Sequence, residues 1–402
     1  MILTDKQNKG LNIAIQRYRN KEKYTTIAGY AGTGKTTLIR FIVDALLNEG
    51  IKERDIVFCA YTGKATLVLQ QKGNDNATTL HKLLYESKPR PDGTFFRIPK
   101  QELNYRVIIV DECSMAPKNM IELLLSHSGI YVIFSGDNAQ LPPIDKDTDN
   151  HLLDNPHIFL DEIQRQAAES DIIQLSLAIR EGKPLKSYKG TNAIIVNKKD
   201  FNTGMMTWAD QILCATNKTR VSLNNQMRQL LNRGDEPEDG DKLICLRNYD
   251  EFCSDDGNVL VNGTTGFVKN CYNSFVTIPR YMLKGKDIGK DNSFNTLEGT
   301  FVGELGDDYG KLIMDYSEIT TGERCMDPKT IYMLGRNKNN LHLIPMEFTY
   351  GYAITTHKAQ GSEWDKILVV EERFPFDRDE HKRWLYTAVT RSADKVVVVL
   401  KD

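Results

Sequence analysis

The chain has 402 residues, of which 40% are hydrophobic and 26% are charged, and its formal net charge is −2. This composition is ordinary for a folded globular protein and excludes a disordered or collagen-like chain. The near-neutral charge also excludes a generally basic nucleic-acid-binding protein, so any contact with phosphates must come from local patches.

The seven cysteines include no C-x-x-C pair and no histidine at a ligand spacing, which argues against a metal site built on cysteine. Cys59 and Cys113 lie in apolar stretches, so we expect buried, reduced thiols. Residues 1–10 lack an apolar signal core, and no apolar run approaches the roughly 18 residues that a membrane span needs. We therefore expect a cytoplasmic protein with no membrane partner.

The first recognisable pattern is a phosphate loop, G-x-x-x-x-G-K-[ST], which runs from Gly29 to Thr36. A β-rich stretch precedes it, and a helical stretch with Leu38, Ile42, Ala45 and Leu46 on one face follows it and stops at Gly50. The glycines let backbone N–H groups turn toward phosphate oxygens. We expect ATP to be held by Gly32, Thr33, Gly34, Lys35, Thr36 and Thr37. Lys35 is expected to reach the β- and γ-phosphates, and Thr36 is expected to bind Mg²⁺.

Further apolar runs at 55–60, 105–112 and 129–137 end in small or acidic residues. Strands that alternate with helices predict a parallel sheet with helices on both faces, whose ligands bind at the carboxyl ends of the strands. Asp111 and Glu112 end the second run, where we expect Asp111 to hold Mg²⁺ and Glu112 to polarise the attacking water. Gln140 follows the third run, within reach of a γ-phosphate.

A second set of strand-like runs lies at 192–197, 210–216, 365–372 and 394–401, without a second phosphate loop. We therefore expect one α/β domain over 1–150 and another over 151–234 and 346–402. Residues 235–345 contain short β-like stretches with turn signals, which predict a small inserted β-barrel. An ATPase also needs a cation opposite the γ-phosphate, and the candidates are Arg391 and Arg165.

These motifs together resemble the superfamily 1 helicases, within them the RecD-like branch that includes the small phage Dda helicases. The resemblance rests on Gln7, GTGKTT, AYTGKA, TTLHKLL, DECS, GDNAQLPP, EIQRQ, HKAQGSEW and YTAVTR, and it covers the chain from Gln7 to Arg391. It implies an α/β protein with two RecA-like parallel-sheet motor domains, an inserted β-hairpin and an SH3-like barrel, of which VNGTTGFV resembles the start. It also implies movement from 5′ to 3′ along single-stranded DNA.

The resemblance implies roles for further residues. Gln7 would read the adenine edge, Gly361 and Glu363 would meet the nucleotide from the second motor domain, and Arg165 and Arg391 would be paired γ-phosphate arginines. The residues expected along the single strand are Thr62, His81, Thr356 and His357. Tyr61 departs from the family because proline is common at its position, which leaves the strand contacts there open.

In this family a short hairpin between TTLHKLL and the acidic pair splits the duplex. The corresponding interval here, 85–105, contains an Asp-Gly turn signal with Phe95 and Phe96 just beyond it. Either both rings pack the hairpin onto its own domain, or one ring packs while the other separates the strands, because adjacent strand residues face opposite ways. Which of the two is the pin stays open.

Two other classes of function were weighed against a helicase. A nucleotide kinase would leave HKAQGSEW and YTAVTR unexplained, and a non-enzymatic DNA-binding scaffold would leave the phosphate loop, the acidic pair and the arginines unexplained. We expect single-stranded DNA and duplex junctions as the substrate, a single-strand-binding or replisome protein as a further partner, and a monomer as the functional unit. The pathway in the cell stays open.

Overall fold

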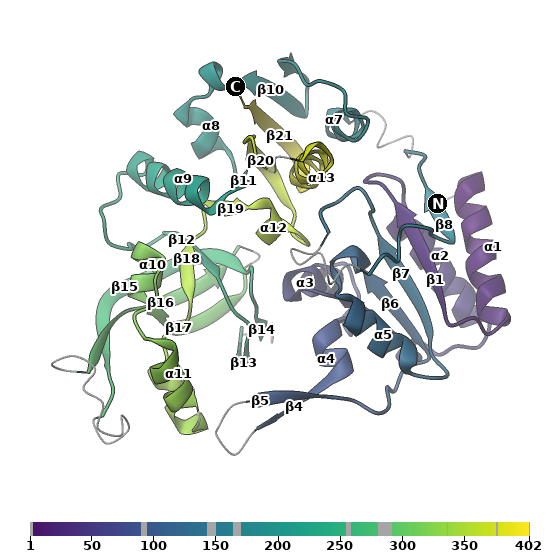
Figure 1. Cartoon of the computed structure of the whole chain (residues 1–402), viewed down its shortest axis with the longest axis horizontal. Coiled ribbons are helices and arrows are strands. Elements are labelled where there is room, and N and C mark those ends of the chain that lie inside the picture. Colours follow the sequence, from purple (N-terminus) through teal and green to yellow (C-terminus); the bar gives the residue numbers. More distant parts are fainter. Residues whose placement is uncertain are drawn as a thin grey trace. The chain divides into compact units, whose positions relative to one another are not determined.

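The computed structural model describes residues 3–89, 95–142, 150–163, 170–254, 259–279, 292–304, 306–335, 337–374 and 377–401 (Figure 1). The chain forms two compact units. Unit 1 comprises Met1–Tyr85, Pro99–Arg220 and Ile354–Asp402, and unit 2 comprises Glu86–Ile98 and Val221–Ala353. Among the described helices, none has both the length and the apolar character that crossing a bilayer requires.

The first sheet of unit 1 is parallel and has the strand order β3-β2-β6-β7-β1-β8. Its strands are β1 (Tyr24–Gly29), β2 (Ile56–Ala60), β3 (Thr78–Thr79), β6 (Val107–Asp111), β7 (Tyr131–Gly136) and β8 (Ile158–Leu160). The strands predicted at 55–60, 105–112 and 129–137 are therefore confirmed as β2, β6 and β7. The two-residue β3 and the three-residue β8 were not predicted.

Helices cover both faces of this sheet, as Figure 1 shows. They are α1 (Asp5–Arg19), α2 (Lys35–Asn48), α3 (Gly63–Gln71), α4 (Leu80–Leu84) and α5 (Lys118–Ser126), with 3-10 turns at Glu53–Asp55 and Cys113–Met115. Because strand side chains alternate, Val107 and Ile109 of β6 pack with α1 and α2, whereas Ile108 and Val110 pack with α4 and α5. This alternation buries β6 on both sides.

Local signals explain where the first two helices begin and end. Thr4 and Gln7 form a reciprocal capping box at the start of α1. In α2, Leu38, Ile42 and Leu46 are fully buried as their spacing predicts, while Ala45 is only half-buried. Gly50 adopts φ 90° just past the helix, a conformation that glycine tolerates and that ends α2.

The second sheet of unit 1 has the order β19-β11-β20-β21-β10-β9. Its strands are β9 (Tyr188–Lys189), β10 (Ala193–Asn197), β11 (Gln211–Cys214), β19 (Ala353–Thr355), β20 (Trp364–Val370) and β21 (Ser392–Leu400). Its helices are α7 (Asp171–Arg180), α8 (Thr203–Trp208), α9 (Asn217–Leu230), α12 (Thr356–Ala359) and α13 (Arg378–Val389), with a 3-10 turn at Lys198–Asp200. Strands β10, β21, β20 and β11 run parallel, and β9 pairs antiparallel with β10. The four strands predicted for the second α/β region are all present.

Unit 2 contains an antiparallel sheet with the order β17-β16-β15-β12-β18. Its strands are β12 (Lys242–Cys245), β15 (Thr265–Thr277), β16 (Ser293–Gly303), β17 (Asp308–Asp315) and β18 (Phe348–Tyr350). The pair β13 (Tyr249–Cys253) and β14 (Val259–Leu260), the helices α10 (Tyr316–Thr321) and α11 (Pro328–Gly335), and the 3-10 turn Lys338–Leu343 accompany it. The hairpin strands β4 (Tyr85–Pro89) and β5 (Phe95–Pro99) pair with each other. Unit 2 extends beyond the predicted insertion to Val221 at one end and to Ala353 at the other, because it includes most of α9 and the strand β18.

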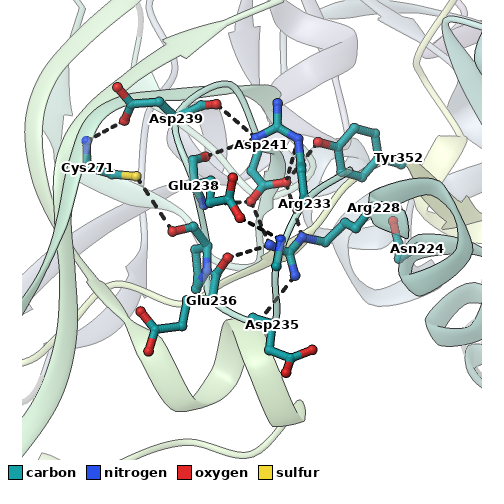
Figure 2. A network of polar contacts seen from close by, with 12 residues as sticks. Asn224, Arg228, Arg233, Asp235, Glu236, Glu238, Asp239, Asp241, Cys271 and Tyr352 are labelled. Carbon is teal, nitrogen blue, oxygen red and sulfur yellow. Dashed lines mark hydrogen bonds and ion pairs between the residues drawn. The ribbon is translucent and has the colours of Figure 1, made fainter. Parts of the chain in front are cut away.

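A buried carboxylate holds the entry and the exit of this sheet together (Figure 2). Asp241 is 0% exposed, and it accepts hydrogen bonds from Arg228 Nε at 3.3 Å, Glu238 N at 2.8 Å and the Tyr352 hydroxyl at 2.8 Å. Arg228 also donates through Nη2 to the second carboxylate oxygen at 3.3 Å. Asp241 immediately precedes β12 and Tyr352 follows β18, so one charge joins both ends of the sheet to α9.

The side chain of Asn224 provides a second link between α9 and the exit segment. Its Nδ2 donates to the Ala353 carbonyl and its Oδ1 accepts from the Ala353 N–H, both at 2.9 Å. This reciprocal pair satisfies the backbone of Ala353 on both sides at the point where the chain leaves the insertion.

Replacing Asp241 with asparagine is expected to destabilise the insertion where the chain enters and leaves its sheet, at β12 and β18. The substitution keeps the volume but leaves the buried Arg228 guanidinium without a counter-charge, which costs about 3–5 kcal/mol. The amides of β12 and β18 should therefore exchange with deuterium about a hundredfold faster or more.

Asp235→Asn is the matched control for this exchange measurement. The Asp235 side chain is exposed, and its contact with Arg228 comes from the backbone carbonyl. Exchange in this variant should match the wild type. If Asp241→Asn also matched the wild type, the buried ion pair would contribute nothing to the local stability of the insertion.

Candidate nucleotide-binding site

The phosphate loop connects β1 to α2 at the carboxyl edge of the first sheet. Gly32 and Gly34 have φ of 74° and 79°, left-handed conformations that turn the loop so that successive N–H groups point inward. Lys35 Nζ donates to the carbonyls of Gly29 at 2.6 Å and Tyr30 at 3.1 Å. Thr33 Oγ1 also donates to the Tyr30 carbonyl, at 2.8 Å. The loop is thus closed on itself by two of its own side chains.

The acidic pair lies at the end of β6. Glu112 has φ 49° and ψ 42°, an uncommon left-handed conformation for a residue with a side chain. Burial raises the pKa of the Glu112 carboxyl, and Asp111 and Asp137 act in the same direction. The cations of Arg391 and Lys35 oppose this rise in pKa. Glu112 therefore has a more basic carboxylate than an exposed glutamate.

Arg391 lies just beyond the end of α13 and is 7% exposed. Its Nη1 is 4.0 Å from Glu112 Oε1 and donates to the Ser362 carbonyl at 3.4 Å, and its Nε donates to the Thr387 carbonyl at 3.2 Å. These carbonyls fix the plane of the guanidinium group. Unit 1 thus brings together two groups that lie far apart in the sequence and were predicted to share one site.

A cavity of about 210 Å³ lies at this meeting point. The predicted site residues that line it are Thr36, Asp111, Glu112, Gly361, Glu363 and Arg391. Gly361 has φ 74°, and a Cβ at this position would approach Ala65 Cβ to 2.9 Å and Thr62 Oγ1 to 3.0 Å. Glycine is therefore required there both by the backbone conformation and by the close packing against α3.

The predicted glutamines lie outside the lining of this cavity. Gln140 is buried, its Oε1 has no hydrogen-bond partner among the described residues, and it lines a separate cavity of about 300 Å³ with Asp137 and Ser114. Gln7 is also buried; its Oε1 accepts from Thr4 N at 3.0 Å and its Nε2 donates to the Gly34 carbonyl at 3.2 Å. In this structure Gln7 contacts the phosphate loop directly. Thr37 is half-buried in the first turn of α2.

The residues predicted to contact DNA differ in exposure. Thr62 caps α3 through Ala65 N at 3.2 Å, and the ring of His81 is near the rings of Tyr61 and Tyr85, with centroids 5.6 and 6.2 Å away. Thr356 is 0% exposed and donates to the Cys214 carbonyl at 3.4 Å, so its side chain is not available at the surface. His357 is half-buried, and burial lowers its pKa, which favours the neutral ring at pH 7.

Three predicted side chains lie outside what the structure describes. Arg165 lies in one of the undescribed segments. Phe95 and Phe96 begin β5, but their side chains are not among the described ones.

Hydrogen bonds that the sequence did not predict join the loop after β7 to the second sheet region. Gln360 Nε2 donates to the Leu141 carbonyl at 2.8 Å, and Leu141 N donates to Thr387 Oγ1 at 2.9 Å. The Arg180 guanidinium lies 3.4 Å from the centre of the Tyr30 ring in the phosphate loop. The motifs HKAQGSEW and YTAVTR contain Gln360 and Thr387, but a motif alone does not show which of its residues bridges two sheets.

The chain matches known families whose members include ATP-dependent helicases. The AAA domain family matches residues 4–198, and the UvrD-like helicase C-terminal domain family matches residues 350–399. The ATP-dependent RecD2 DNA helicase of Deinococcus radiodurans is 27% identical over 399 residues, which cover 93% of this chain and 46% of the relative. The ATP-dependent DNA helicase Dda of Enterobacteria phage T4 is 27% identical over 266 residues, which cover 56% of this chain and 57% of the relative. The chain spans about half the length of these curated relatives.

Solved structures show the same fold. The Pif1 helicase from Bacteroides, crystallised with ADP-AlF3 and ssDNA, superposes with a TM-score of 0.53 at 16% identity, covering 100% of this chain and 95% of that chain. The Pif1 helicase from Candida albicans gives a TM-score of 0.51 at 17% identity with the same coverage. The resemblance predicted from the motifs is confirmed: the chain belongs to the superfamily 1B helicase family, in the branch that contains RecD, Pif1 and Dda.

Proposed function

We propose that this protein is an ATP-dependent DNA helicase that moves from 5′ to 3′ along single-stranded DNA and unwinds duplexes in replication, recombination or repair. The observation that carries the proposal is the 210 Å³ cavity, where the start of α2, the acidic pair and a buried arginine meet. A nucleotide kinase needs no arginine from a second sheet region at this place. A DNA-binding scaffold that does not hydrolyse ATP needs no acidic pair beside this arginine.

Under this proposal, the residues of the phosphate loop, the acidic pair and Arg391 each have a role in hydrolysis. The backbone of Gly32, Thr33 and Gly34 and the side chain of Lys35 bind the β- and γ-phosphates. The Glu112 carboxylate, made more basic by burial, takes a proton from the attacking water. Arg391 stabilises the charge that develops on the γ-phosphate oxygens.

The oxygen donors at this cavity fit a magnesium ion, because Thr36 and Asp111 line it together as hard ligands. Thr36 and Asp111 would hold the ion, and when bound it supplies positive charge to the β- and γ-phosphate oxygens. Gln7, Thr37, Gly361 and Glu363 would bind the remainder of the nucleotide. Gln140 and Arg165 would complete the γ-phosphate contacts, Gln140 through the N–H groups of its side-chain amide, because a phosphate oxygen accepts hydrogen bonds.

The proposed DNA contacts are Thr62, His81, Thr356 and His357. Because the Thr356 side chain is buried, only its backbone could face a strand. The Bacteroides Pif1 structures contain single-stranded DNA, which supports the same substrate here. The motor domains would comprise 1–150 and 151–234 with 346–402, and 235–345 would be an SH3-like domain. The protein would act as a monomer, with a single-strand-binding or replisome protein directing it.

A fork assay with opposite-polarity tails tests this function. The wild type should unwind a fork with a 5′ single-stranded tail, hydrolyse ATP faster with single-stranded DNA, and leave a fork with only a 3′ tail intact. Lys35→Ala is the inactive control because it removes the ammonium that binds the phosphates. Unwinding of the 3′-tailed fork alone would refute the proposed polarity, and DNA-independent ATP turnover without unwinding would refute the helicase function.

The β4–β5 hairpin is the proposed pin that separates the strands. Opening one base-pair step costs about 1.4 kcal/mol of stacking, and an aromatic side chain returns about 1–3 kcal/mol per stacked base. One phenylalanine could therefore offset most of one step. Either Phe95→Ala or Phe96→Ala should lose unwinding while DNA-stimulated ATPase and single-strand translocation continue. If neither variant separates these activities, the pin lies elsewhere.

A further inference from the structure

A tyrosine of α13 contacts the phosphate loop and the Gln140 loop at the same time. The Tyr386 hydroxyl accepts a hydrogen bond from Ala31 N at 3.0 Å and donates to Asp137 Oδ2 at 2.6 Å. Ala31 belongs to the phosphate loop, and Asp137 directly follows β7 at the start of the loop that carries Gln140. One hydroxyl therefore joins three segments of unit 1.

The tyrosine and the aspartate in this contact are shielded from water, while Ala31 is half-buried. Tyr386 and Asp137 are both 1% exposed, and the other carboxylate oxygen of Asp137 accepts from Ala139 N at 2.9 Å. Burial raises the pKa of the Tyr386 hydroxyl, so it keeps its proton and remains a donor to the carboxylate. Loss of the hydroxyl would leave a buried carboxylate oxygen of Asp137 and the N–H of the half-buried Ala31 without this partner.

The next residue of α13, Thr387, makes a second connection to the loop that follows β7. Thr387 Oγ1 accepts from Leu141 N at 2.9 Å, and the Thr387 carbonyl accepts from Arg391 Nε at 3.2 Å. Two consecutive residues of one helix therefore hold both ends of the 137–141 loop, and one of them also holds the arginine. A shift of this loop cannot occur without strain on α13 or loss of these bonds.

We propose that the Tyr386 hydroxyl is a positioning group. It keeps the phosphate loop and the Gln140 loop at fixed positions relative to Arg391. The inference rests on the proposed function, because it assigns Tyr386 a part in nucleotide turnover at that site. Tyr386 does not touch the reacting atoms. It acts on the rate through the orientation of Arg391 and of the loop that carries Gln140.

Tyr386→Phe tests the proposal, with Tyr131→Phe as the matched control. Tyr131 is 4% exposed, and its hydroxyl also makes two hydrogen bonds, to the Ala14 carbonyl at 2.7 Å and with Thr25 Oγ1 at 2.6 Å. The melting temperature should fall by a similar amount in both variants. Tyr386→Phe alone should lower DNA-stimulated kcat about 10- to 100-fold, the cost of a small misplacement of catalytic groups. Its KM for ATP should stay within about threefold of the wild type.

A double-variant cycle shows whether Tyr386 acts through Arg391. In an Arg391→Lys background, measured by single-turnover hydrolysis, adding Tyr386→Phe should change the rate less than about twofold. Fully additive losses would contradict the proposal, and so would a Tyr386→Phe kcat equal to that of Tyr131→Phe. If Tyr386→Phe does not fold, Thr387→Val tests the same link with an isosteric side chain, and wild-type turnover in that variant would overturn the proposal.

The wild type and the Tyr386→Phe variant distinguish a failure of the proposed function from a failure of the positioning role. A wild type that shows no DNA-stimulated ATP turnover refutes the proposed function and the inference with it. An active wild type with an equally active Tyr386→Phe variant refutes only the inference.

Discussion

Replacing Arg391 with lysine is expected to lower DNA-stimulated ATP turnover by about 10³- to 10⁵-fold, the range for arginines that stabilise phosphoryl transfer. The guanidinium is held in one plane by the carbonyls of Thr387 and Ser362, with Nη1 4.0 Å from Glu112 Oε1. A lysine keeps the charge but has no planar fork, so it cannot keep these bonds and contact a phosphate together.

Steady-state ATP hydrolysis with saturating single-stranded DNA measures this effect. Arg378→Lys is the matched control, because Arg378 is an exposed arginine at the start of the same helix. Its turnover should equal that of the wild type. Retention of more than about a tenth of the activity by Arg391→Lys would mean that the cation acts at a distance or not at all.

Glu112→Gln is expected to bind ATP as the wild type does and to hydrolyse it about 10²- to 10⁴-fold more slowly. The amide has the shape of the carboxylate but cannot accept a proton from water. Since burial already raises the pKa of Glu112, the carboxylate that is lost is an effective base. Binding of a fluorescent ATP analogue and turnover should therefore separate in this variant.

Two comparison variants make this result specific to Glu112. Glu122→Gln, at an exposed position of α5, should change neither binding nor turnover. Lys35→Ala should weaken both together, because it removes a phosphate contact rather than a base. Wild-type turnover in Glu112→Gln would show that the base is another residue.

The strands that line the nucleotide site could be predicted because they are strongly apolar and end in motif residues. The runs that became β2, β6 and β7 are buried on both faces, which leaves little choice but a central parallel strand. The strands β3, β8, β9 and β19 have only two or three residues each. Their pairing depends on neighbours in space, and so few residues carry no periodic signal.

The sheet of unit 2 shows a second reason why strand boundaries could not be predicted from the sequence. The sequence predicts separate β-like stretches around 258–270 and 274–280, whereas the structure has one strand, β15, from Thr265 to Thr277. An irregularity in its pairing with β16 lies between Lys269 and Tyr272. Such an irregularity interrupts the alternation of exposed and buried residues, which is the signal that defines a strand in a sequence.

Within the site, the sequence predicted which residues take part in the reaction better than it predicted which residues contact one another. The phosphate loop, the acidic pair and Arg391 were identified because their residue types and order are specific to one reaction. Tyr386 and Thr387 stand in the same YTAVTR motif, but no property of a tyrosine or threonine in a sequence indicates a bond to a loop about 250 positions away. Gln7 also shows this, since its contact with Gly34 depends on how α1 packs beside α2.

The antiparallel pairing of β12 with β18 has a consequence for how this chain could have been assembled. Leu243 lies opposite Tyr350, so the chain enters and leaves the insertion at neighbouring positions. A tight turn can join neighbouring antiparallel strands, so an ancestor could have carried a simple hairpin here and exchanged its tip for a whole domain. Growth of the chain at such a tip leaves the order of α9 and β19 in the sequence unchanged, so an insertion here can differ in size without altering the strand order of the second sheet.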